Sequence, residues 1–189
     1  MGPGLSHDPL LFVDACTWIN LFATGRIAEI LRALPYRFAA SRYVSEEEVL
    51  TVSTGGESGS GSGGVQHLDL RALERAGQVE IADVETRAEI VELVRFAVEL
   101  DDGEASTCAL AVCRGGRVAT DDRKALRVLG RLTPQILTHQ TPELLQEWAL
   151  AAEVRDDQVR EVLAAVRDRG HFYPRRDAPA FVWWSGLLP

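Results

Sequence analysis

Five short apolar segments alternate with amphipathic segments along this chain of 189 residues. A short apolar run bounded by turn signals is typical of a strand that is buried on both faces, as in a parallel sheet. Regular alternation of strand and helix places helices on both sides of such a sheet. We therefore expect an α/β protein with a three-layer α/β/α arrangement and a roughly five-stranded parallel sheet. The expected strands are residues 10–15, 36–41, 78–84, 117–120 and 135–139.

The chain divides into an α/β domain at residues 8–140 and a helical C-terminal extension at 141–189. Within the domain, residues 42–52 and 85–100 show helical spacing, and the second stretch places Ile90 and Val94 on one apolar face. The extension is expected to end in an irregular aromatic tail. In that tail, Trp183 and Trp184 either pack over the domain or a dimer partner, or form an exposed anchor for another protein.

Residues 54–64 read TGGESGSGSGG, a low-complexity segment that we expect to be a flexible loop between helices. Such a composition has too few apolar side chains to form a core. The segment is compatible with a natural insertion and equally with an engineered replacement of a longer loop.

The composition excludes several classes of protein. The chain has a formal net charge of −8, which is not the charge of a typical nucleic-acid-binding domain, although a metal held by carboxylates reverses the field locally. Its three cysteines have no paired metal-ligand spacing, which argues against a disulfide framework and a zinc site. The sequence has neither a membrane-spanning run nor a signal-peptide pattern, so we expect a cytoplasmic protein.

Acidic residues recur where the predicted strands end. Because the carboxyl ends of parallel strands form the ligand-binding edge of an α/β sheet, these acids are expected to meet there. Carboxylates held close together raise one another's pKa values unless a cation such as Mg²⁺ or Mn²⁺ lies between them. Helix capping is the alternative for each acid taken singly, and Asp101 and Asp102 are expected to be caps. The acids in question are Asp14, Glu46, Glu47, Glu48, Asp102, Glu104, Asp121 and Asp122.

Four stretches, FVDACTWINLF, SRYVSEEEV, DDGEASTCALAV and VATDDRKALRVL, follow one another within about residues 10–140. Together they resemble the successive motifs of the PIN-domain nucleases, in particular the VapC-like toxins and the PIN proteins with a GEA motif. The resemblance implies an Mg²⁺- or Mn²⁺-dependent endoribonuclease that cleaves single-stranded RNA. It also implies a toxin-like or RNA-processing role, with RNA, a small antitoxin protein and a second copy of the chain as partners.

The motifs assign roles to particular residues of this chain. The resemblance implies that Thr120 and Thr17 support the site, and that Asp121 adds a ligand to the metal set. Three consecutive glutamates leave the register open, so Glu46 and Glu48 are alternatives to Glu47. The acids expected to hold the metal and to serve catalysis are Asp14, Glu47, Glu104 and Asp122.

Basic residues near these acids are candidates for binding the RNA backbone. Arg42 precedes the three glutamates, whereas Arg123, Lys124, Arg127 and Arg131 follow the last motif on one predicted helix. A solvated charged face is the alternative interpretation of each. Arg123, Lys124 and Arg42 are the ones that we assign to RNA binding. Asn20, on the first helix, is compatible with either a surface amide or a site residue.

Two other functions are compatible with this pattern. The chain could be a PIN-fold module that binds proteins and has little or no catalytic activity. It could also be a phosphatase or phosphotransfer domain with Asp14 as nucleophile. That chemistry calls for a second acid two residues later, where this chain has Cys16.

Overall fold

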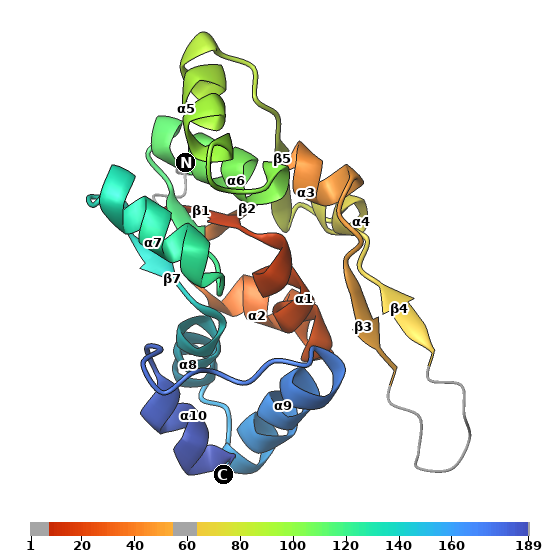
Figure 1. The fold of residues 1–189 in the computed structure, drawn as a ribbon. Helices are drawn as coiled ribbons and strands as arrows, with labels where there is room; N and C mark the ends of the chain where they lie inside the picture. The colour runs from red at the N-terminus through yellow and green to blue at the C-terminus, as the bar shows by residue number, and fades with distance from the viewer. Residues whose placement is uncertain (1–7, 55–63, 189) are drawn as a thin grey trace, which may run out of the picture.

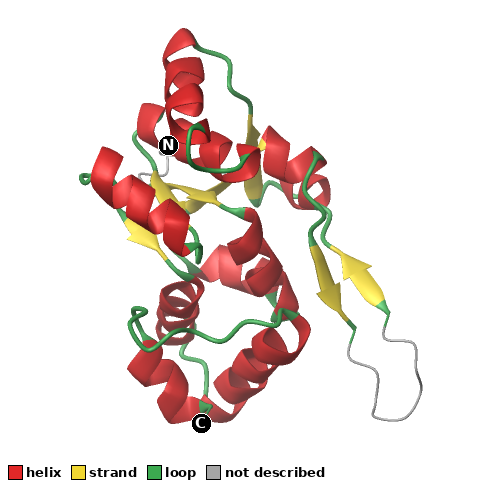
Figure 2. Ribbon diagram, in the orientation of Figure 1, coloured by secondary structure: helices red, strands yellow, loops and turns green. Residues whose placement is uncertain are grey.

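The computed structural model describes residues 8–54 and 64–188. Its centre is a five-stranded sheet in which every pair of neighbouring strands is parallel, in the order β5-β2-β1-β6-β7. This confirms the predicted α/β class and all five predicted strands, although each strand is shorter than predicted. Figures 1 and 2 show helices on either side of the sheet. The strands are β1 (Leu10–Val13), β2 (Arg37–Ser41), β5 (Val79–Ala82), β6 (Arg117–Ala119) and β7 (Thr138–His139).

Alternate residues of the central strands belong to two separate hydrophobic cores. In β1, Leu11 and Val13 pack into the first core, whereas Phe12 packs into the second. Because successive side chains of a strand point to opposite faces, the two cores lie on opposite sides of the sheet. This is the three-layer arrangement predicted from the sequence.

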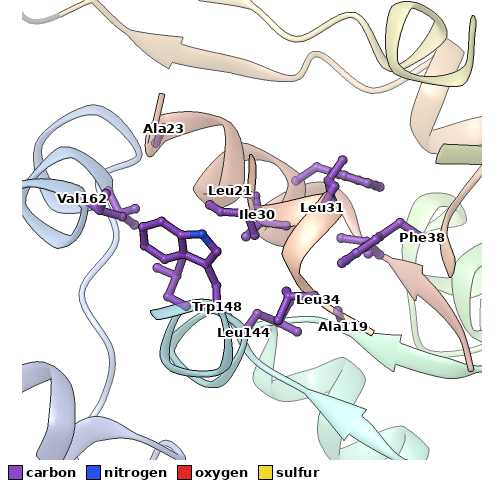
Figure 3. Close-up of a cluster of buried hydrophobic side chains, with 14 of the residues drawn as sticks. Leu21, Ala23, Ile30, Leu31, Leu34, Phe38, Ala119, Leu144, Trp148 and Val162 are labelled. Atoms are coloured by element: carbon purple, nitrogen blue, oxygen red, sulfur yellow. The ribbon is translucent and has the colours of Figure 1, made fainter. Parts of the chain in front are cut away.

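The first core is covered by α1 (Ala15–Ala23), α2 (Ile27–Ala33) and α8 (Thr141–Ala151), and α9 (Asp156–Arg169) and α10 (Phe181–Leu187) pack outside them. Figure 3 shows Trp148 of α8 lying between Leu144 and Val162. The C-terminal helices therefore share one core with the sheet. The helices of the second core are α5 (Arg87–Ala97), α6 (Asp102–Cys113) and α7 (Arg123–Leu132).

The prediction of a long helix over residues 42–52 is wrong. Helix α3 (Arg42–Glu46) is short, and the chain then forms an antiparallel hairpin of β3 (Thr51–Ser53) and β4 (Val65–His67), after which α4 (Leu70–Arg75) begins. Tertiary packing decides this region, because Val52 is buried in the first core while its neighbours Thr51 and Ser53 are half-buried. The Gly/Ser segment thus joins two strands rather than two helices. Apart from its first and last residues, that segment lies outside the described residues.

Two further predictions need correction. The expected buried face of α5 is mostly exposed: Ile90 is 49% and Val94 63% exposed, and the helix instead buries Glu89 and Phe96. The aromatic tail is not irregular throughout, because it ends in α10. There, Trp184 is fully buried and Trp183 packs partly buried against the first core, as expected for a tail packed over the domain.

No helix within residues 8–54 and 64–188 combines the length and the apolar character needed to cross a membrane.

Candidate active site

The neighbouring strands β1 and β6 end side by side and bring Asp14 together with Thr120. Asp14 lies directly after β1 and is 5% exposed. One of its carboxylate oxygens accepts the N–H of Ala15 at 2.9 Å, which makes Asp14 the N-cap of α1. The other accepts the Thr120 hydroxyl at 3.0 Å. Burial raises the pKa of Asp14, and these donors oppose the increase.

Cys16 belongs to the same group, a role that the sequence analysis did not assign. Its thiol donates to Asp14 Oδ2 at 3.3 Å, and its sulfur accepts the backbone N–H of Asp121 at 3.4 Å. Burial and the charges of Asp14 and Asp121 raise the thiol's pKa, so the group remains a protonated donor. The sequence signal was its position two residues after a strand-end acid, on the first turn of a helix.

Asp121 lies in a network of protein donors. Its oxygens accept the Asn20 side-chain amide at 3.0 Å, the Thr141 backbone N–H at 3.0 Å and the Thr17 hydroxyl at 3.4 Å, together with the Thr141 hydroxyl. Asn20 is 3% exposed, so it is a buried partner of this carboxylate and not a surface amide. Asp121 therefore ties the loop after β6 to α1 and to the start of α8.

Asp122 is the N-cap of α7. Its Oδ1 accepts the backbone N–H groups of Lys124 at 2.7 Å and Ala125 at 2.9 Å, and its own N–H donates to Thr120 Oγ1 at 3.1 Å. The capping interpretation of Asp122 thus holds for this oxygen. It does not prevent Asp122 from contributing charge to the site, because Asp122 is one of the groups that raise the pKa of Glu104.

Glu104 stands in the first turn of α6 and faces the other acids. Asp101, not Asp102, is the N-cap of this helix: its side chain accepts the Glu104 N–H at 2.8 Å, and the Glu104 carboxylate accepts the Asp101 N–H at 3.4 Å. Burial and the charges of Asp101, Asp122 and Asp14 raise the pKa of Glu104 to about 7. The structure thus brings both Asp14 and Asp122 within electrostatic reach of Glu104.

Of the three consecutive glutamates, Glu48 is the one that reaches this cluster. Its carboxylate lies against Gly103, where a Cβ would come within 2.6 Å of Glu48 Oε1, and burial and the charges of Asp101 and Asp14 raise its pKa. Glu46 instead pairs with Arg42 and Arg71, and Glu47 is exposed at the end of α3. The register that we preferred for the second acid is therefore displaced by one residue, because α3 ends at Glu46 and the following turn directs Glu48 inward.

The carboxylate oxygens of these acids are the type of donor that a hard cation prefers. Within the described residues, no three carboxylate, imidazole or thiol groups form a ready-made metal site. Mg²⁺ commonly uses one or two carboxylates and completes its shell with water, so an all-oxygen group of Asp14, Glu104 and Asp122 meets its donor chemistry. Burial is the main cause of the raised pKa values of Asp14 and Glu104, and the charges of neighbouring acids add to it. A divalent ion would relieve the part that comes from charge repulsion.

The basic residues predicted to contact RNA have different surroundings. Arg42 is paired with Asp83 at 2.7 Å, whereas Lys124 is exposed on α7. Arg123 and Arg127, one turn apart on α7, line a groove of about 430 Å³. The other wall of this groove is formed from residues 172–178 of the C-terminal extension, and Asp121 also lines it. Because the sequence gives no periodic signal for residues 172–178, this second wall was not foreseen.

Comparison with models of known protein families gives no match for this chain, and comparison with curated proteins gives none either.

Proposed function

We propose that this protein is a metal-dependent endoribonuclease of the PIN-domain type that cleaves single-stranded RNA. The observation that supports this best is the convergence of Asp14, Glu104 and Asp122, from three separate elements, at the carboxyl edge of the sheet. The four motif-like stretches support the family, since all of them contribute residues to this edge. A cytoplasmic, toxin-like role with a small antitoxin as partner belongs to the same proposal.

In this proposal, Asp14 and Glu104 would hold Mg²⁺ or Mn²⁺, and Asp122 and Glu48 would add negative charge to the cluster. A bound divalent ion lowers the pKa of bound water and stabilises the charge that develops on a phosphodiester. Thr120 and Cys16 fix the Asp14 carboxylate by donating to it at 3.0 and 3.3 Å. Asp121 has a positioning role, because its oxygens are occupied by Asn20, Thr17 and Thr141.

The test is cleavage of a single-stranded RNA in the presence of Mn²⁺. Asp14→Asn and Glu104→Gln each remove one charge from the cluster and should lower the cleavage rate by at least a hundredfold, roughly 3 kcal/mol of transition-state stabilisation. Glu161→Gln, at an exposed position of α9, removes the same charge far from the cluster and should leave the rate unchanged. If Asp14→Asn cleaves RNA as fast as the natural chain, the nuclease assignment is wrong.

The alternative is a PIN-fold module whose main activity is to bind another protein. The exposed apolar surface of α5 and its C-cap supports it, since Val91 and Val94 of the helix and Val98 at the cap are between 58% and 79% exposed. Thermal unfolding with and without Mn²⁺ separates the two functions. A metal-binding site raises the melting temperature by mass action, and an interaction module without one shows no such increase.

A further inference from the structure

We propose that the groove between α7 and residues 172–178 is a subsite that binds single-stranded RNA next to the acid cluster, with Tyr173 as a stacking surface for a base. This inference deepens the proposed function, because it assigns the C-terminal extension a direct part in holding the substrate. It rests on the charges, the aromatic groups and the position of the groove.

The charge of the groove favours a phosphate backbone. Arg123 and Arg127 form no ion pair with any residue in the described part of the chain, so their charges are available to a ligand. Arg175, on the opposite wall, pairs at 3.2 Å with Asp177, and both side chains are well exposed. An exposed pair of this kind contributes little stability, so a phosphate can compete for the arginine. Asp121 also lines the groove, but protein donors already occupy its carboxylate.

Tyr173 gives the groove an aromatic surface, and contacts with other side chains and the backbone fix the position of its ring. Its ring packs edge-to-face against Trp184 at 6.2 Å and Phe181 at 6.5 Å between ring centroids, and its hydroxyl donates to the carbonyl oxygen of Leu188 at 3.3 Å. Tyr173 is nevertheless 43% exposed. A fixed, partly exposed ring beside arginines is the combination with which proteins bind single strands, by stacking bases while cations hold the phosphates.

The backbone around this wall is also fixed. His171 and Ala180, at either end of the segment, have φ values of 53° and 57°, in the left-handed region that non-glycine residues rarely adopt. Such conformations persist only where the surrounding structure enforces them. Pro174, within this segment, and Trp184, just after it, are both buried.

The position of the groove suits a strand that continues toward the acids. Asp121 lines it, and the next residue, Asp122, is the acid that caps α7. RNA lying along the groove would therefore run beside the loop that carries Asp122. A duplex suits the groove less well, because its bases are already stacked on one another and not free to lie on Tyr173.

The test measures the affinity of the full chain for a fluorescently labelled single-stranded oligouridine in EDTA, by fluorescence anisotropy, so that binding is separated from cleavage. Arg127→Gln should weaken binding at low salt and reduce the salt dependence of log Kd by about 0.7, the value for one phosphate contact on a single strand. Tyr173→Ser should weaken binding about tenfold, and Tyr173→Phe should restore it to within about twofold, because phenylalanine keeps the stacking ring.

Two variants serve as controls. Arg160→Gln removes the same charge as Arg127→Gln from an exposed position on α9 outside the groove, and it should leave affinity unchanged. Asp177→Asn frees Arg175 and should strengthen binding or leave it unchanged. Melting temperatures of all variants establish that each is folded.

The outcomes distinguish this inference from the proposed function. If Arg127→Gln and Tyr173→Ser bind as tightly as the natural chain while RNA is still cleaved, the subsite is refuted and the nuclease remains. If RNA binds through these residues but is never cleaved with Mn²⁺, the subsite stands and the nuclease assignment fails. If the variants weaken the binding of a duplex RNA as much as the binding of the single strand, Tyr173 does not act as a stacking surface for a base.

Discussion

Glu104→Gln should make the metal-free protein more stable at neutral and alkaline pH, although it removes a side chain that we assign to the active site. The pKa of Glu104 is raised from 4.5 to about 7 by burial and by the charges of Asp101, Asp122 and Asp14. A carboxyl group whose pKa is higher in the folded state supports folding at low pH. That support is lost as the pH rises from about 4.5 through about 7.

The magnitude follows from this shift. A tenfold change in proton affinity corresponds to about 1.4 kcal/mol, so a change from 4.5 to about 7 sets an upper bound of about 3.4 kcal/mol. The Glu104 side chain is partly exposed, and solvent screens its repulsion from the other acids. We therefore expect a gain of about 1 kcal/mol for the glutamine variant, or roughly 2–4 °C in melting temperature for a chain of this size. Glutamine can still accept the Asp101 N–H, so the cap is retained.

The assay is thermal unfolding followed by circular dichroism in EDTA at about pH 5 and about pH 8, for the natural chain and for Glu104→Gln. The difference between the two proteins should be small at the lower pH and favour the variant at the higher pH. Added Mn²⁺ should then raise the melting temperature of the natural chain more than that of the variant. A difference that is the same at both pH values, or a variant that is less stable at the higher pH, would refute the reasoning.

Two further predictions concern the scaffold. Glu89 is 3% exposed, and burial alone would raise the pKa of its carboxyl group. Hydrogen bonds from Arg114 and from the N–H groups of Thr86 and Glu85 instead lower this pKa to about 2. Its contribution to stability is therefore present above about pH 4.5 and lost toward about pH 2. Glu89→Gln should lower the free energy of unfolding by about 2 kcal/mol at neutral pH and flatten the acid side of its pH dependence, as measured by urea unfolding. A variant with an unchanged pH dependence would contradict this. Trp184→Ala should lower the free energy of unfolding by about 3–5 kcal/mol in the same assay, because the side chain is fully buried against the first core. Val182→Ala, at an 83% exposed position, should lower it by less than about 0.5 kcal/mol. Equal losses for the two would mean that α10 does not pack as described.

The fold was largely predictable because its signals are local. Short apolar runs bounded by turn signals, such as residues 10–15, favour buried strands, and their alternation with helices leaves few topologies. The errors arose where tertiary contacts override local pattern. Residues 47–52 have helical spacing, yet Val52 lies in a strand, from which its side chain is buried in the first core. The apolar face of α5 was misassigned because periodicity identifies a face without indicating whether a partner covers it.

The site was predictable only in part, for a similar reason. Strand-end position was enough to select Asp14, and the cap of α6 was narrowed to two residues. Whether Glu47 or Glu48 turns inward depends on where α3 ends, and three identical residues contain no signal of that. The role of Asp121 as an anchor depends on Thr141, which lies on a different helix and 20 residues away. The position of Tyr173 and the existence of the groove depend on the path of residues 172–178, whose sequence has no periodic pattern that would predict it.

The bond between Asp121 and Thr141 has a consequence for protein synthesis. The loop that presents Asp122 is anchored to the first residue of α8, and α8 is held in turn through Trp148 and Val162 of the next helix in the shared core. A nascent chain that has emerged only as far as β7 thus contains all the acids but lacks Thr141, the partner that anchors Asp121 and the loop before Asp122. We expect the arrangement of the acids to be completed late in translation, after α8 and α9 have left the ribosome.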